Sequence, residues 1–132
     1  MMATYLLDSS VLIDVLNGKH GRRLLLEELL RHGHLLGCCS VNVTEVFAGA
    51  RPPEEARTAE FLGSLEYYEV TWEIARRAGL LLRDYRQRGI TLALGDATVA
   101  AVAIAHRLPL LTDNVRHYPM KELELYPLPQ AN

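Results

Sequence analysis

Residues 3–16 read ATYLLDSSVLIDVL. A short apolar run stops at Asp8, two serines follow, and apolar residues then recur every three or four positions until Asn17-Gly18. The first spacing favours a strand and the second a helix, so the stretch predicts a strand before Asp8 and a helix after it. The serine at position 9 or 10, Ser9 or Ser10, supplies an oxygen that can cap the first amides of this helix.

The same alternation of strand-like and helix-like stretches continues along the chain. Further strands are expected at 35–39, 67–70 and 108–112, with a weak edge strand at 123–126. Further helices are expected at 22–31, 43–50, 54–65, 72–89 and 96–107, with Ser40 and Thr71 as two of the caps. Strands that alternate with helices predict an α/β sandwich around a mostly parallel sheet of four to five strands.

The composition is that of a globular protein. The chain has 132 residues, a formal net charge of -2 at pH 7 and 49% apolar residues, so we expect one domain over residues 1–132. Its two cysteines, Cys38 and Cys39, are adjacent, which is typical neither of a disulfide framework nor of a zinc site. No apolar stretch approaches the ~20 residues of a membrane span. We therefore expect a cytoplasmic protein without membrane contact.

Acidic residues follow the expected strands. Asp8 comes after the first strand, Glu45 lies about one turn into the helix after the second, Asp96 opens the most apolar helix, and Asp113 follows the fourth strand. Parallel strands bring these ends to one edge, where α/β folds bind ligands. Carboxylates gathered in a cleft repel one another unless a cation is present. Oxygen ligands favour Mg2+ or Mn2+ over zinc.

Each acid also has an ordinary structural explanation. Asp8 could cap its helix, although the serines beside it already offer oxygens for that purpose. Asp96 could merely complement a helix dipole, although its apolar neighbours favour a partly buried site. Glu45 fits a solvated helix face almost as well, and Asp113 alone is typical of a turn. We favour a functional role for Asp8 and Asp96, and expect Asp14 to face solvent.

Four stretches carry a resemblance to a known family. They are 5–16 (YLLDSSVLIDVL), 40–49 (SVNVTEVFAG), 94–103 (LGDATVAAVA) and 111–118 (LTDNVRHY). In this order and at this spacing they resemble the PIN-domain family, and within it the VapC-type toxin ribonucleases. Each motif is weak alone, whereas the four together are specific. The resemblance implies a three-layer α/β/α fold and cleavage of RNA that depends on Mg2+ or Mn2+.

The resemblance also implies which residues form the site. Asp8, Glu45 and Asp96 occupy the matching acidic positions of the family. Ser9 and Thr44 match neighbouring positions that could orient a metal ligand or a phosphate. The mechanism implied is in-line hydrolysis of a phosphodiester, which requires no covalent enzyme intermediate.

The fourth acidic position departs from the family pattern. The family has Thr, any residue, then Asp or Asn, so Thr112 and Asn114 fill the pattern and Asp113 lies one residue early. Strand alternation, if it continued, would point Asp113 away from Asn114. We expect Asp113 still to contribute, through a water or a second metal, with a smaller effect on its loss than Asp8.

The charge of the site and the resemblance also indicate which partners the protein binds. An acidic cleft repels RNA, so arginines of the helix 72–89 or Arg116 should carry the backbone contacts. The resemblance suggests a homodimer inhibited by a small antitoxin protein, and the leucine-rich segments 24–30 and 61–65 could form such contacts or pack inside the monomer. The alternatives are a catalytically silent interaction module and a housekeeping RNA-processing nuclease. Phosphoryl transfer through Asp8 lacks support, because position 10 is a serine and not an acid.

Overall fold

The computed structural model describes residues 2–128 and contains, within them, a five-stranded sheet in which all paired strands are parallel. The strands are β1 (Thr4–Leu7), β2 (Leu35–Cys39), β3 (Glu66–Tyr68), β4 (Leu110–Thr112) and β5 (Leu125–Pro127), in the spatial order β3-β2-β1-β4-β5. The predicted parallel sheet and its weak fifth strand at an edge are confirmed. The expected domain, residues 1–132, also includes Met1 and residues 129–132, which lie outside the described residues.

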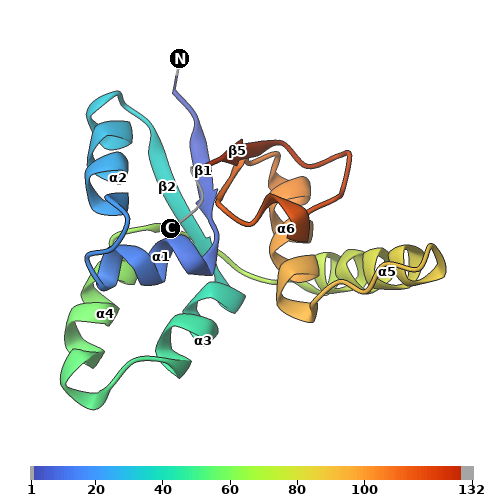
Figure 1. Cartoon of the computed structure of the whole chain (residues 1–132), viewed down its shortest axis with the longest axis horizontal. Coiled ribbons are helices and arrows are strands. Elements are labelled where there is room, and N and C mark those ends of the chain that lie inside the picture. The colour runs from blue at the N-terminus through green and yellow to red at the C-terminus, as the bar shows by residue number, and fades with distance from the viewer. Residues whose placement is uncertain (1, 129–132) are drawn as a thin grey trace.

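Helices cover both faces of the sheet. They are α1 (Ser9–Leu16), α2 (Arg22–Arg31), α3 (Ser40–Ala48), α4 (Glu55–Gly63), α5 (Trp72–Gln87) and α6 (Leu94–His106), with short 3-10 turns η1 (Pro52–Glu54) and η2 (Val115–His117). Figure 1 shows α1 to α4 gathered to one side of β1 and β2, and α5 and α6 to the other. None of these helices within residues 2–128 has the length and apolar character needed to cross a membrane.

Alternation along the strands divides the core into two layers. Leu6 and Leu110 pack in the cluster that holds α5 and α6, whereas Leu7 and Leu111 pack in the cluster that holds α1 to α4. Successive side chains of a strand point to opposite faces, so each strand contributes to both layers. Helix α6 is buried on every side from Ala97 to Ala103, as its apolar sequence predicts. The three-layer α/β/α architecture is confirmed.

Two strand boundaries differ from the prediction for local reasons. The fourth strand starts at Leu110, not at 108, because Pro109 has no N–H for the ladder and contributes only its carbonyl, which accepts from the Leu6 amide at 2.9 Å. The third strand ends at Tyr68, before the predicted residue 70. The Val70 amide donates instead to the Ser40 hydroxyl at 3.2 Å.

Of the predicted helix caps, one is confirmed and two are wrong. Thr71 accepts from the Ile74 amide at 3.2 Å and caps α5. Neither Ser9 nor Ser10 caps α1, because both hydroxyls bond to side chains of other elements. Ser40 is the first residue of α3 and not its cap, because its hydroxyl is taken up by the chain after β3. Serines at strand ends here serve the tertiary structure.

Candidate active site

The register of the sheet brings three strand ends level. Leu6 pairs with Gly37 of β2 and with Leu110 of β4, and the Asp8 amide donates to the Leu111 carbonyl at 3.0 Å. Side chains that follow β1, β2 and β4 therefore meet at the same edge of the sheet. This is the convergence that the spacing of the acidic residues predicts.

Asp8 is held by the neighbouring strand end. Its side chain is 7% exposed, and its Oδ2 accepts from the Thr112 hydroxyl at 2.7 Å and from Ser10 at 3.4 Å. Asp8 stands at the N-cap position of α1, but its side chain makes no capping hydrogen bond. The capping explanation therefore does not account for the carboxylate, which belongs to the network at the sheet edge.

Glu45 is exposed, but a series of hydrogen bonds that is buried at Asn42 orients its side chain. Its Oε1 accepts from the Ser9 hydroxyl at 2.6 Å, and Ser9 in turn accepts from the Asn42 amide nitrogen at 2.9 Å. Asn42 is fully buried, and its Oδ1 accepts from the Cys39 amide at 2.8 Å. These hydrogen bonds link the residues after β1 to those after β2. They also direct the Glu45 carboxylate to Ser9.

Gly95 lets the start of α6 approach this carboxylate. A Cβ atom on Gly95 would lie 3.0 Å from Glu45 Oε2 and 3.6 Å from a methyl group of Val41. A Cβ at this position would require the Glu45 carboxylate to move by a few tenths of an ångström. The close approach places Asp96, the next residue, at the same site as Glu45.

Asp96 is partly buried and lies close to the other two acids. Burial raises the pKa of its carboxyl group, and the charges of Asp8 and, to a smaller extent, Glu45 raise it further. His117 and Tyr118 act in the opposite direction: His117 Nδ1 lies 3.4 Å from Oδ2, and the Tyr118 hydroxyl donates to Oδ1 at 3.3 Å. The three carboxylates of Asp8, Glu45 and Asp96 therefore act on one another electrostatically.

Asp113 has a different environment. Its Oδ2 lies 3.2 Å from Nη2 of Arg22, a buried guanidinium on α2, and its Oδ1 accepts from Ser10 at 3.4 Å. The side-chain amide of Asn114 donates to the same Ser10 hydroxyl at 3.4 Å, and its backbone amide donates to Thr112 Oγ1 at 2.9 Å. The alternation expected after β4 is not kept, because the chain turns there and brings both side chains to Ser10.

Two sequence-based expectations are corrected by their contacts. Asp14 does not simply face solvent: its Oδ2 lies 2.9 Å from His20 Nδ1 and 3.9 Å from Arg22 Nε. Thr44 is exposed and donates to the Ser40 carbonyl of its own helix at 3.2 Å, so its hydroxyl is not directed to the carboxylates. Ser9, the other secondary candidate, does contact Glu45.

Sequence reasoning missed four residues of this network, which are Ser10, Arg22, Asn42 and Tyr118. A signal existed for Asn42, which precedes Glu45 by three positions and so shares a helix face with it. No local signal marks Arg22, because its partner Asp113 lies 91 positions away in the chain.

The cysteine thiols lie in the core, and Cys39 joins this network through its backbone amide, which donates to Asn42 Oδ1. Both are buried and free, and burial raises the pKa of the Cys38 thiol to about 11. A thiol of this kind is not ionised at neutral pH and makes a poor nucleophile. Cys39 packs in the core layer of α5 and α6, and Cys38 in the layer of α1 to α4.

The donor chemistry of the acid cluster suits a hard cation. Asp8, Glu45 and Asp96 offer only carboxylate oxygens. Burial first, and then the charge of Asp8, raises the pKa of Asp96, and a bound cation would favour its ionised form. Within residues 2–128, no three His, Cys, Asp or Glu side chains already form a group that could hold a metal ion. The carboxylates thus fit a divalent cation chemically, but they do not form a closed ligand set in this arrangement.

Nearly the whole chain is similar in sequence to proteins of a known family. The PIN domain model matches residues 5–123. Ribonuclease VapC19 of Mycobacterium tuberculosis is 36% identical over 115 residues, which cover 87% of this chain and 92% of that protein. Ribonuclease VapC10 of the same organism is 38% identical over 117 residues, covering 89% of this chain and 87% of that protein.

Solved structures share the fold. VapBC2 from Rickettsia felis, solved bound to a DNA fragment from the promoter, superimposes with a TM-score of 0.83 at 21% identity and covers 96% of this chain and 99% of that one. A toxin-antitoxin complex from Klebsiella pneumoniae gives a TM-score of 0.76 at 27% identity, covering 94% and 99%. The described fold is therefore similar to that of chains found in such complexes.

Proposed function

Because the chain belongs to the PIN-domain family, we propose that it is a metal-dependent ribonuclease and the toxin of a toxin-antitoxin pair, with residues 1–132 acting as one domain. The observation that carries the proposal is the meeting of Asp8, Glu45 and Asp96, from three separate elements, at a site whose negative charge the protein leaves unbalanced. Two relatives named as ribonucleases, each more than a third identical, support RNA as the substrate.

Asp8, Glu45 and Asp96 would hold Mg2+ or Mn2+. When bound, such an ion activates water and neutralises charge that develops on the phosphate. The chain's own residues prepare the ligands: Thr112 fixes Asp8, and Ser9 fixes Glu45. These hydroxyl donors hold the two carboxylates in one orientation before a substrate arrives.

We propose that Asp113 and Asn114 act on the site indirectly, through Ser10. Both bind Ser10, whose hydroxyl also lies 3.4 Å from Asp8 Oδ2. The charge of Asp113 is already matched by Arg22. Asp113 therefore contributes less to cation binding than the other three acids.

RNA would be held by cations outside the acid cluster. Against two acidic residues, helix α5 carries four exposed arginines, which are Arg76, Arg77, Arg83 and Arg86. Arg88 is exposed at its C-terminal cap, and Arg116 is exposed just after β4. Guanidinium groups bind phosphate through paired N–H donors, so RNA binding should weaken steeply as salt concentration rises.

The direct test is cleavage of a structured RNA with and without EDTA, for the unaltered protein and for Asp8→Asn. We expect cleavage that needs Mg2+ or Mn2+ and that falls to background in the variant. Equal cleavage in excess EDTA would exclude the metal mechanism, and no cleavage under any metal would favour a silent interaction module. A toxin, unlike a housekeeping nuclease, should arrest growth when expressed alone and lose that effect in Asp8→Asn.

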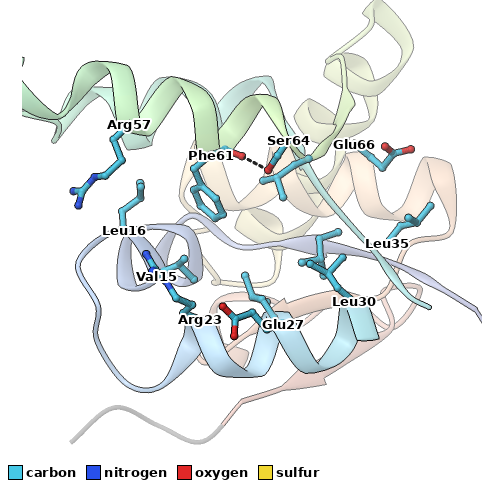
Figure 2. Close-up of a pocket in the computed structure, with 13 residues that line it drawn as sticks. Val15, Leu16, Arg23, Glu27, Leu30, Leu35, Arg57, Phe61, Ser64 and Glu66 are labelled. Carbon is cyan, nitrogen blue, oxygen red and sulfur yellow. Dashed lines mark hydrogen bonds between the residues drawn. The ribbon is translucent and has the colours of Figure 1, made fainter. Parts of the chain in front are cut away.

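A groove between α2 and α4 is the proposed site for the antitoxin (Figure 2). Its volume is about 360 Å³, and Leu30 of α2 and Phe61 of α4 face each other across it. Arg23, Glu27, Arg57 and Glu66 stand among its lining residues. A concave apolar groove with charged residues around it fits an inserted partner segment better than the flat self-complementary patch of a dimer.

This part of the proposal has a matched control on the same helix. Leu30 and Leu24 are both exposed, at 51% and 70%, but only Leu30 lines the groove. Leu30→Asp should weaken binding of the proposed small antitoxin by at least about tenfold, whereas Leu24→Asp should not. If Leu30→Asp instead dissociates a dimer, as measured by light scattering, a second copy of the chain occupies the groove.

A further inference from the structure

The ring of Tyr118 fills its place in the core, and its hydroxyl group is not required for that packing. Tyr118 follows η2, is 2% exposed, and packs its ring in the core cluster with Met120 and Leu123. A phenylalanine would fill the same space. The hydroxyl emerges from this apolar cluster at the acid site, where it donates to Asp96 Oδ1 at 3.3 Å.

This hydroxyl lies in the field of two carboxylates. Burial raises the pKa of Tyr118, and so do the negative charges of Asp8 and then of Asp96. The phenol is therefore a neutral donor that lies beside Asp8 and Asp96.

The contacts of Asp96 differ in rigidity. Within the described part of the chain, its carboxylate is contacted by Tyr118 on Oδ1 and by His117 on Oδ2. The His117 side chain is 58% exposed and lies 3.4 Å away, so it can turn into solvent. The Tyr118 ring is fixed by close packing, so its hydroxyl is the contact that keeps one orientation.

We propose that Tyr118 is a positioning residue that fixes the Asp96 carboxylate relative to Asp8, so that the two acids present their remaining oxygens to one divalent cation. The role rests on the proposed metal-dependent function. Donors of this kind hold a ligating carboxylate in the orientation the ion requires, and their loss typically costs 10–100-fold in metal affinity or activity.

A nearby tyrosine provides a matched control. Tyr85 of α5 is also buried, and its hydroxyl donates to the Pro119 carbonyl at 3.2 Å, one residue beyond Tyr118. Tyr85→Phe therefore removes a buried phenol hydrogen bond in the same region without touching a carboxylate. Both Phe variants keep the ring, so both should fold.

The experiment measures Mn2+ binding by titration calorimetry without RNA, together with kcat and KM for RNA cleavage. For Tyr118→Phe we expect metal affinity about tenfold weaker, a lower kcat and an unchanged KM; for Tyr85→Phe we expect no change in any of them. Unchanged Mn2+ affinity in Tyr118→Phe, or an equal loss in both variants, would overturn the positioning role.

The same experiment separates this inference from the proposed function. If the unaltered protein binds Mn2+ and cleaves RNA while Tyr118→Phe behaves identically, the ribonuclease proposal stands and the positioning role is wrong. If the unaltered protein binds no Mn2+, both are wrong. If Tyr118→Phe unfolds at a lower temperature than Tyr85→Phe and loses no metal affinity, the hydroxyl serves only the fold.

Discussion

Asp96 and Asp113 both lie near Asp8, but the protein balances the charge of only one. Asp113 is 11% exposed in its side chain and lies against the buried guanidinium of Arg22. Asp96 is 26% exposed and lies close to Asp8 and Glu45, and among residues 2–128 its carboxylate contacts a tyrosine hydroxyl and an exposed histidine. The difference teaches that acids at one sheet edge need not share a role: one is paired within the fold, and the other leaves negative charge for a cation.

The strongest test of this comparison replaces the unbalanced acid. Asp96→Asn should lower RNA cleavage by about 1,000-fold, because a bound cation supplies several kcal/mol of stabilisation to the transition state and each 1.36 kcal/mol is tenfold in rate. Single-turnover cleavage at saturating Mg2+ measures the loss. A rate within tenfold of the unaltered protein would remove Asp96 from the ligand set.

The next effect concerns the ion pair between Asp113 and Arg22. Arg22→Met should lower the free energy of unfolding by about 3 kcal/mol, because removing one member of a buried ion pair leaves the other charge unmatched. Urea unfolding measures the change, and Arg31→Met is the control, because Arg31 forms its ion pair with Glu28 on an exposed surface. Equal losses in the two variants would mean that the Arg22 pair is no more than a surface contact.

A smaller effect is expected from the charge of Asp113 itself. Asp113→Asn should reduce cleavage by less than about tenfold and leave the Mg2+ dependence nearly unchanged, since its carboxylate acts through Ser10. Asn114→Ala, measured side by side, removes the side-chain amide that donates to the Ser10 hydroxyl. A shift of the Mg2+ curve as large as that of Asp8→Asn would make Asp113 a ligand and end its contrast with Asp96.

The smallest effect is a pH dependence of stability. The fold raises the pKa of Asp96 above its unfolded value, so the ionised group destabilises the native state, and this penalty disappears as pH falls through the raised pKa. Asp96→Asn should therefore be slightly more stable than the unaltered protein at pH 7, with the gap closing towards pH 4. Urea midpoints at both values measure it, and a gap that widens at low pH would contradict the assigned shift.

Sequence pattern alone predicted the architecture and the edge where the acids meet. Periods of two and 3.6 residues marked the strands and helices, and an acid just after a parallel strand must lie at the carboxyl edge. Asp8 was singled out from that position, and Asp96 from its place near the start of the most apolar helix. Local chemistry was less reliable: serines that suit a helix cap, such as Ser9, were taken up by distant partners.

Tertiary structure alone decided which acids are paired and what holds them. Thr112 reaches Asp8 across 104 positions of the chain, and Arg22 reaches Asp113 across 91. Residue spacing determines which face of its own strand or helix a side chain occupies, because that follows from the backbone period. It does not determine which side chain from another element arrives there, because that depends on how the packed layers bring remote segments together. The charge balance of each carboxylate depends on that arrival.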